Sequence, residues 1–195
     1  MNERETMVRN LFKSIAALAV IAVITGIGQP TQTVSAADME LVIGTGNTKG
    51  KLFAAGVAIS MASVLQGKGV KVYNYGTKGG KDNIKRISKK KRAINFGLVT
   101  AKDLTKAKKK QIKAFSGLMA LGKAKGQTVL LIVRNKSPKK VSKEAYAAAV
   151  AEVVRILKSS QTTKMVTEQW SGYAPSSAAG DFKAAGVKLH KAAIM

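Results

Sequence analysis

The chain of 195 residues contains no cysteine, one histidine and three prolines. The absence of cysteine excludes a disulfide framework, thiolate metal sites and cysteine redox chemistry. Ten acidic residues and a single histidine leave little material for a histidine-based catalytic centre or a metal cage. A G-x-S-x-G nucleophile motif is also missing. We therefore expect a non-enzymatic protein with no catalytic residues, no metal and no cofactor.

A hydrophobic fraction of 46% is typical of a folded chain rather than a disordered one. The main compositional feature is positive charge. Lysine and arginine total 34 against ten acidic residues, which gives a formal net charge of +24. Charge at such density repels itself and attracts polyanions or acidic protein surfaces.

The N-terminal segment has the pattern of a secretory signal peptide. Arg9 and Lys13 stand shortly before an uncharged apolar run at residues 14–28, and residues 34–36 (V-S-A) supply small residues for cleavage near Ala36. We expect a cleaved leader at residues 1–36 and a periplasmic domain at residues 37–195. Retention of the run as a membrane anchor is the alternative, although the run is shorter than the ~20 residues of a spanning helix.

Apolar periodicity after the leader predicts alternating strands and helices. Strands are expected at residues 39–46, 70–75, 93–99 and 128–134, and helices at residues 50–66, from 82 or 83 onward, 102–110, 141–158 and 162–172. The segment 114–121 is ambiguous. This alternation predicts an α/β fold with a mostly parallel sheet and helices on both faces.

In parallel sheets, ligands bind beyond the carboxyl ends of the strands, so three βα loops matter most: residues 44–50, 76–83 and 100–103. The first two contain glycines that allow backbone N–H groups and a helix N-terminus to approach a small anion. Tight turns without a ligand are the alternative.

Two familiar phosphate-binding motifs are excluded at the first loop. A P-loop needs glycine where Thr45 stands and serine or threonine where Leu52 stands. A dinucleotide fingerprint needs an acidic residue about 20 positions on, and none lies between Glu40 and Asp82.

The loops resemble those of the TAXI-type solute-binding proteins of tripartite ATP-independent periplasmic (TRAP) transporters. The matching segments are T-G-N-T-K-G-K-L-F at 45–53, T-K-G-G-K-D-N at 77–83, N-F-G-L-V-T-A-K at 95–102 and G-V-K-L-H-K-A-A at 186–193. The resemblance implies a type II periplasmic-binding-protein fold, a small organic acid or similar anion as ligand and TRAP membrane subunits as partners. Family members close two lobes around the ligand, whereas residues 37–195 have room for one.

The loops and the resemblance together predict a ligand-binding set. Its members are Thr45, Gly46, Asn47, Thr48, Gly50, Phe53, Thr77, Gly79, Gly80, Asn83 and Thr100. Trp170 is interpreted as a core or rim aromatic, with stacking on a ligand as the alternative. A lone lobe leaves its cleft face open, so homo-oligomerisation is a further expectation.

Basic residues concentrate at residues 78–92, with eight against one acid, and at residues 102–113, with six against one. The predicted polyanion- or partner-binding set is Lys81, Lys85, Arg86, Lys89, Lys90, Lys91 and Arg92. In the alternative function, the chain is a single lobe without a transport role that docks electrostatically to an acidic periplasmic protein or a polyanion. The simplest interpretation is that the lysines only make the surface soluble. Sequence-specific nucleic-acid binding is not expected, because lysine far outnumbers arginine and no nucleic-acid-binding motif is present.

Overall fold

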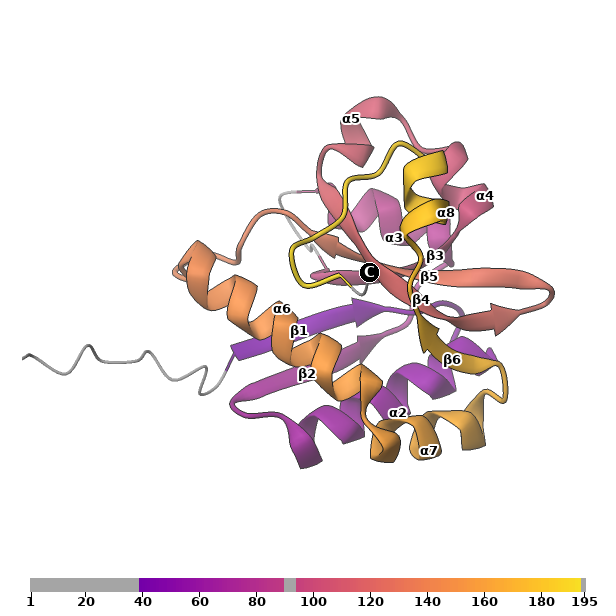
Figure 1. The fold of residues 1–195 in the computed structure, drawn as a ribbon, viewed down its shortest axis with the longest axis vertical. Helices are drawn as coiled ribbons and strands as arrows, with labels where there is room; N and C mark the ends of the chain where they lie inside the picture. The colour runs from indigo at the N-terminus through magenta and orange to yellow at the C-terminus, as the bar shows by residue number, and fades with distance from the viewer. Residues whose placement is uncertain (1–38, 90–93, 194–195) are drawn as a thin grey trace, which may run out of the picture. The chain divides into compact units, whose positions relative to one another are not determined.

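The structure is a computed structural model that describes residues 39–89 and 94–193 (Figure 1). The predicted leader at residues 1–36 lies outside the described residues. So do Lys90, Lys91 and Arg92 of the predicted partner-binding set.

Within the described residues, six strands form one sheet in the order β2-β1-β3-β5-β4-β6. The strands are β1 (Met39–Gly44), β2 (Val70–Tyr75), β3 (Phe96–Thr100), β4 (Phe115–Ala124), β5 (Gln127–Arg134) and β6 (Tyr173–Ser176). β1 pairs in parallel with β2 along its whole length, from Met39 opposite Val70 to Gly44 opposite Tyr75, and it also runs parallel to β3. β5 is antiparallel to both β3 and β4, and β6 is antiparallel to β4. The α/β class is therefore confirmed, but the prediction of a mostly parallel sheet is wrong, because the sheet is mixed.

The hairpin between β4 and β5 explains the difference. Lys125 and Gly126 join the two strands with φ values of 50° and 73°. Positive φ at both central residues is the geometry of the two-residue turns that match the twist of antiparallel strands. The ambiguous segment at 114–121 is therefore part of a strand that forms a hairpin with the predicted strand at 128–134.

The helices lie on both faces of the sheet. They are α2 (Lys51–Gln66), α3 (Gly80–Ile87), α4 (Ala101–Thr105), α5 (Lys109–Ile112), α6 (Lys143–Lys158), α7 (Ser160–Gln169) and α8 (Ala179–Ala184). α2, α6 and α7 pack on one face, and α3, α4, α5 and α8 belong to the other (Figure 1). The helix expected at 102–110 is divided into α4 and α5, while α6 confirms the helix expected at 141–158.

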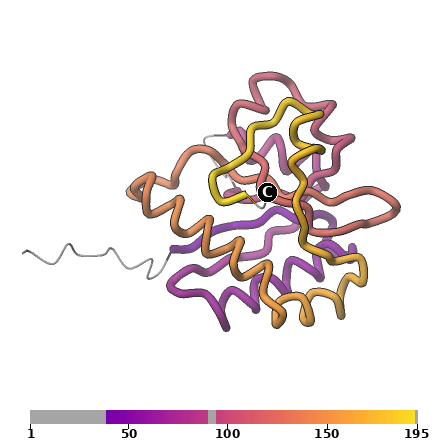
Figure 2. The backbone as a smooth tube through the Cα atoms, in the orientation of Figure 1, coloured from indigo at the N-terminus to yellow at the C-terminus, as the bar shows by residue number. Residues whose placement is uncertain are grey.

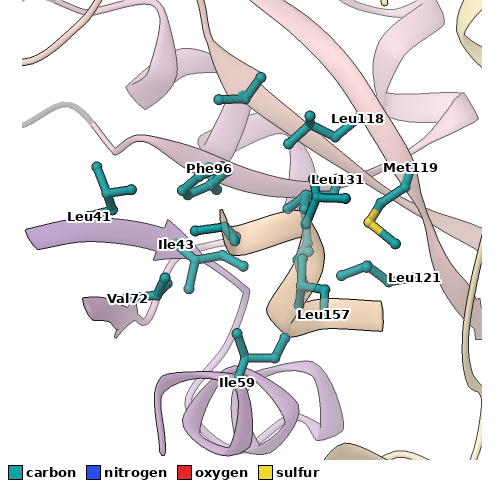
Figure 3. Packing of buried hydrophobic residues seen from close by; sticks show 14 of the residues in the cluster. Leu41, Ile43, Ile59, Val72, Phe96, Leu118, Met119, Leu121, Leu131 and Leu157 are labelled. Atoms are coloured by element: carbon teal, nitrogen blue, oxygen red, sulfur yellow. The ribbon is translucent and has the colours of Figure 1, made fainter. Parts of the chain in front are cut away.

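Each face has its own buried core, and β5 contributes to both. Leu131 packs with the first core and Leu130 with the second, as the two-residue period of a strand requires. Figure 3 shows part of the first core, where Ile59 of α2 and Leu157 of α6 lie beside the sheet residue Ile43.

The C-terminal segment returns to the sheet beside β4, next to the edge strand β6 (Figure 2). Leu189 forms a parallel bridge with Gly117 of β4, and the N–H of His190 donates to the Gly117 carbonyl over 2.9 Å. Nδ1 of His190 accepts a hydrogen bond from the N–H of Ala192. Burial, assisted by Lys191, lowers the pKa of His190, so the side chain favours the neutral form that this hydrogen bond needs.

Two asparagine side chains hold β1 and β3 together. The strands pair directly at only two positions, Ile43–Phe96 and Gly44–Gly97. Fully buried Asn83 of α3 donates from Nδ2 to the carbonyls of Gly44 (3.0 Å) and Leu98 (2.7 Å).

Asn95 supplies the second link. Its Oδ1 accepts from the N–H of Val42 over 2.9 Å, and its own N–H donates to the Val42 carbonyl over 2.9 Å. These side chains satisfy backbone groups that a longer strand ladder would otherwise pair.

Replacing Asn83 with leucine tests this link. The N83L chain leaves two buried carbonyls without their donor, so we expect its free energy of unfolding to fall by about 1–3 kcal/mol in urea titrations. The control is Asn135→Leu, since Asn135 makes its hydrogen bonds at an exposed position. Equal losses for both variants would contradict a special role for Asn83.

Candidate functional site

A cleft of 880 Å³ lies beyond the carboxyl ends of β1 and β3. Three βα loops contribute to it, together with the β4–β5 turn and the segment that leads into β6. The lining residues are Thr45, Gly46, Asn47, Lys49, Gly50, Lys51, Leu52, Lys78, Gly79, Gly80, Leu98, Val99, Thr100, Asp103, Lys123, Ala124, Lys125, Gln127, Val129, Trp170, Ser171 and Gly172. The chain leaves β1 for α2 on one face and enters β3 from α3 on the other. The cleft is thus at the point where strand order reverses, the usual ligand position in open α/β sheets.

The loop between β1 and α2 is fixed by side-chain hydrogen bonds beneath the cleft. Buried Thr45 donates from its hydroxyl to Oδ1 of Asn74 over 2.8 Å, and Nδ2 of Asn74 donates to the carbonyl of Phe53 over 3.0 Å. α2 then begins after its N-cap residue Gly50. No side chain caps the helix there. The first N–H groups of a helix have no acceptor within the helix, so this uncapped N-terminus presents partial positive charge to the cleft.

The loop between β2 and α3 is tied to the first loop. The N–H of Thr77 donates to the carbonyl of Gly46 over 2.8 Å. Gly79, the N-cap of α3, has a φ of 98°, a value that favours glycine, and it provides no side-chain cap. Two uncapped helix N-termini therefore border the same cleft.

Asp82 and Arg86 of α3 form an ion pair beside this loop. Oδ2 of Asp82 accepts from Nε of Arg86 over 2.9 Å and from the N–H of Lys78 over 3.2 Å. Burial of Asp82 opposes its ionisation, but these hydrogen bonds outweigh burial and lower the pKa of the carboxyl group. The carboxylate thereby helps to hold Lys78 at the rim of the cleft.

The third loop carries Asp103, the one carboxylate that lines the cleft among the described residues. Its Oδ2 accepts from the N–H of Thr100 (3.0 Å) and from the Thr100 hydroxyl (2.8 Å), and the N–H of Asp103 donates back to that hydroxyl. This capping box starts α4. The hydrogen bonds of the Asp103 carboxylate are thus made to Thr100 within the same loop.

The lining has a strong excess of positive charge. Lys49, Lys51, Lys78, Lys123 and Lys125 line the cleft, and all five are exposed. Against the single carboxylate of Asp103, they give the lining an excess of four positive charges. The arrangement suits an anion and disfavours a cation.

Seven of the eleven predicted ligand-binding residues line the cleft. They are Thr45, Gly46, Asn47, Gly50, Gly79, Gly80 and Thr100. The other four, Thr48, Phe53, Thr77 and Asn83, lie outside the lining. Thr77 accepts the N–H of Gly79 at its hydroxyl, and Asn83 links β1 to β3, so these two side chains support the loops from below.

The described members of the predicted partner-binding set also lie outside the cleft lining. Lys81, Lys85 and Lys89 are exposed. Arg86 differs from them, because it pairs with Asp82 and its guanidinium lies 5.1 Å from the centroid of the Tyr75 ring. Its charge is therefore engaged within the chain.

The β4–β5 turn was not predicted to contribute, and Trp170 in the segment before β6 was interpreted as a core or rim aromatic, with stacking on a ligand as the alternative. Trp170 lines the cleft but is only 4% exposed, and its indole N–H donates to the carbonyl of Lys123 over 2.9 Å. The N–H of Lys123 donates to the Gly172 carbonyl over 2.9 Å. Trp170 thus offers a ligand little ring surface and instead anchors the turn that carries Lys123 and Lys125.

Comparison with known proteins finds no match of the chain to any protein-family model or to any curated protein sequence. Within residues 39–89 and 94–193, no three histidine, cysteine, aspartate or glutamate side chains are grouped so that they could hold a metal ion. Over the same part of the chain, no helix combines the length and apolar character needed to span a bilayer.

Gly80 allows the start of α3 to approach Asp103. A Cβ added at Gly80 would overlap the Asp103 carboxylate. In G80A, we expect the clash to disturb the Thr100–Asp103 capping box and to lower the free energy of unfolding by about 1–3 kcal/mol, measured by urea denaturation. The matched control is Gly180→Ala on α8, where an added Cβ meets nothing within 4 Å. Equal free energies of unfolding for G80A and G180A would show that the close approach of α3 to Asp103 does not contribute to stability.

Proposed function

We propose that the chain is an exported, single-lobe solute-binding protein that binds a small organic anion in the cleft, as in the TAXI-type binding subunits of TRAP transporters. The observation that carries the proposal is the excess of positive charge on a cleft where three βα loops meet. The cleft volume of 880 Å³ is within the range of small-molecule sites.

The distribution of polar and apolar residues favours an organic anion. Leu98, Val99 and Val129 are buried side chains that contribute apolar lining, whereas the lysines on three separate connections are exposed. The carbon body of the ligand would cover the apolar residues, while its anionic group would meet the lysines and the N-termini of α2 and α3.

The family resemblance supports the same site. The segments 45–53, 77–83 and 95–102 each contain residues that line the cleft. In the proposal, the described residues correspond to one half of a type II periplasmic binding protein, and TRAP membrane subunits are the partners of the exported chain.

Removing two lysines from different walls of the cleft tests ligand binding. Thermal shift with millimolar dicarboxylates, amino acids and phosphate identifies a ligand, and titration calorimetry gives its affinity. For K78Q/K125Q we expect binding to weaken by about 10- to 100-fold, because each substitution removes a charge that faces the anion.

The control, K139Q/K143Q, removes the same charge from exposed lysines outside the cleft. Equal weakening in both double variants would indicate a general charge effect rather than a site. No stabilisation by any of these anions would count against the proposal.

A second candidate function is electrostatic docking to an acidic periplasmic protein or a polyanion. Its specific support is the exposure of the lysines on α4 and α5 and the connection between them, which are Lys102, Lys106, Lys108, Lys109 and Lys110. Both salt bridges found in the described residues use arginine, so lysine charge on this surface is not neutralised by ion pairs there.

Salt dependence tests docking. With fluorescent polyglutamate as the acidic probe, we expect affinity to fall steeply between ~50 and ~200 mM salt. K102Q/K106Q/K109Q should bind more weakly than K136Q/K139Q/K143Q, which removes equal charge from exposed lysines elsewhere. An affinity that salt does not change would reject electrostatic docking.

A further inference from the structure

The outer surface of α2 and β2 carries an exposed apolar patch, formed by Val57, Met61, Val64, Leu65 and Tyr73. The four α2 residues recur at i, i+4, i+7 and i+8, so they form one stripe along the helix. Val64 and Leu65 are 61% and 64% exposed. We call this set the α2–β2 patch.

The patch contains an apolar groove of 320 Å³. Met61, Val64, Leu65 and Tyr73 line it, together with Ser60 and Val72. Six of the seven large hydrophobic residues exposed in the described part of the chain belong to α2 or β2, the seventh being Leu189. Such concentration of exposed apolar surface marks a contact site, whereas single exposed residues do not.

The helix beneath the patch is uncharged in a chain that is otherwise strongly basic. No lysine, arginine, aspartate or glutamate occurs at residues 52–66. A helix that is apolar on all sides is normally buried on all sides. Only the inner side of α2, with residues such as Ala55 and Ile59, is buried within the chain.

We propose that the α2–β2 patch is the surface through which two copies of this chain associate. A second copy presents the same uncharged stripe, so a two-fold contact is self-complementary. Elsewhere, copies with a formal charge of +24 repel each other. This inference is independent of ligand binding in the cleft.

An acidic partner or an anionic membrane fits the patch less well. The α2 stripe carries no cation that could pair with an acidic protein. The basic helices α3, α4 and α5 belong to the opposite face of the sheet, so a membrane in contact with α2 would be far from their lysines (Figure 1).

Sheet extension is blocked at the centre of the β2 edge. Oγ of Ser63 accepts from the N–H of Val72 over 2.8 Å and lies 3.5 Å from the Val72 carbonyl oxygen. These are groups that an added strand would need. The copies would therefore meet through side chains of the stripe and the groove, not through a continuous sheet.

Sedimentation velocity of the full chain tests the proposal. We expect a concentration-dependent dimer that becomes tighter as salt is raised, because screening reduces the repulsion between like-charged copies. Electrostatic docking to an acidic probe has the opposite salt dependence.

Two substitutions in the patch should weaken the dimer. In L65K, burial of an unpaired charge should raise the dimer dissociation constant by at least about 100-fold. M61Q should weaken it without adding charge, which keeps the test valid if L65K fails to fold. Leu189→Lys adds the same charge outside the patch and should leave the dimer intact.

Several results would overturn the proposal. One is a monomer at every protein and salt concentration. Another is a dimer that neither L65K nor M61Q weakens, which would assign association to another surface or to the apolar run at residues 14–28. A third is a monomer that binds anionic lipid vesicles through Leu65, which would identify a membrane as the occupant.

Discussion

The contact between the neighbouring strands β1 and β3 holds the sheet together and positions the loops of the cleft. Because the two strands pair directly at only two positions, amide side chains complete the backbone hydrogen bonding. Asn83 comes from α3, so its hydrogen bonds to Gly44 at the end of β1 and to Leu98 in the middle of β3 also fix α3 against both strands. The position of the cleft loops therefore depends on the buried side-chain amide of Asn83 and on α3, which carries it.

Charge is distributed unevenly over the two faces of the sheet. Lysines crowd the helices α3 to α5, while the helix α2 on the other face has fifteen consecutive residues without charge after Lys51. Since like charges repel and apolar surface associates, the two faces should respond to salt in opposite directions. The cleft lies at the edge between these faces, where its loops combine lysines with an apolar lining.

Much of the fold could be predicted from local sequence patterns. The strand at residues 70–75 and the helix at 141–158 follow from β-branched content and helical periodicity, and glycines identified two of the cleft loops. The β4–β5 turn was missed because Lys125-Gly126 is a weaker turn signal than Asn-Gly. α8 was missed because its support is distant in sequence: the ring of Phe182 occupies the space where Gly117 lacks a side chain.

The cleft could likewise be predicted only in part, because some of its residues follow from local sequence patterns and others depend on pairing between distant segments. Loops that follow β1, β2 and β3 meet at one edge in any parallel arrangement, so their contribution could be inferred from strand order alone. Lys123 and Lys125 reach the cleft only because β5 pairs antiparallel with β3, which brings the hairpin turn to the carboxyl end of β3. No local pattern reports such a long-range pairing.

Under the proposed function, the anchored hairpin turn would let one lobe surround a ligand on several sides. Hydrogen bonds from Trp170 to Lys123 and from Lys123 to Gly172 hold the turn in place, so its lysines line the same cleft as those near the β1 and β2 loops. Asp103 is engaged in its capping box and offsets one positive charge. The remaining repulsion would be relieved by a bound anion, and a ligand that binds only the folded state stabilises that state. By this linkage, the proposed anion would stabilise the folded lobe.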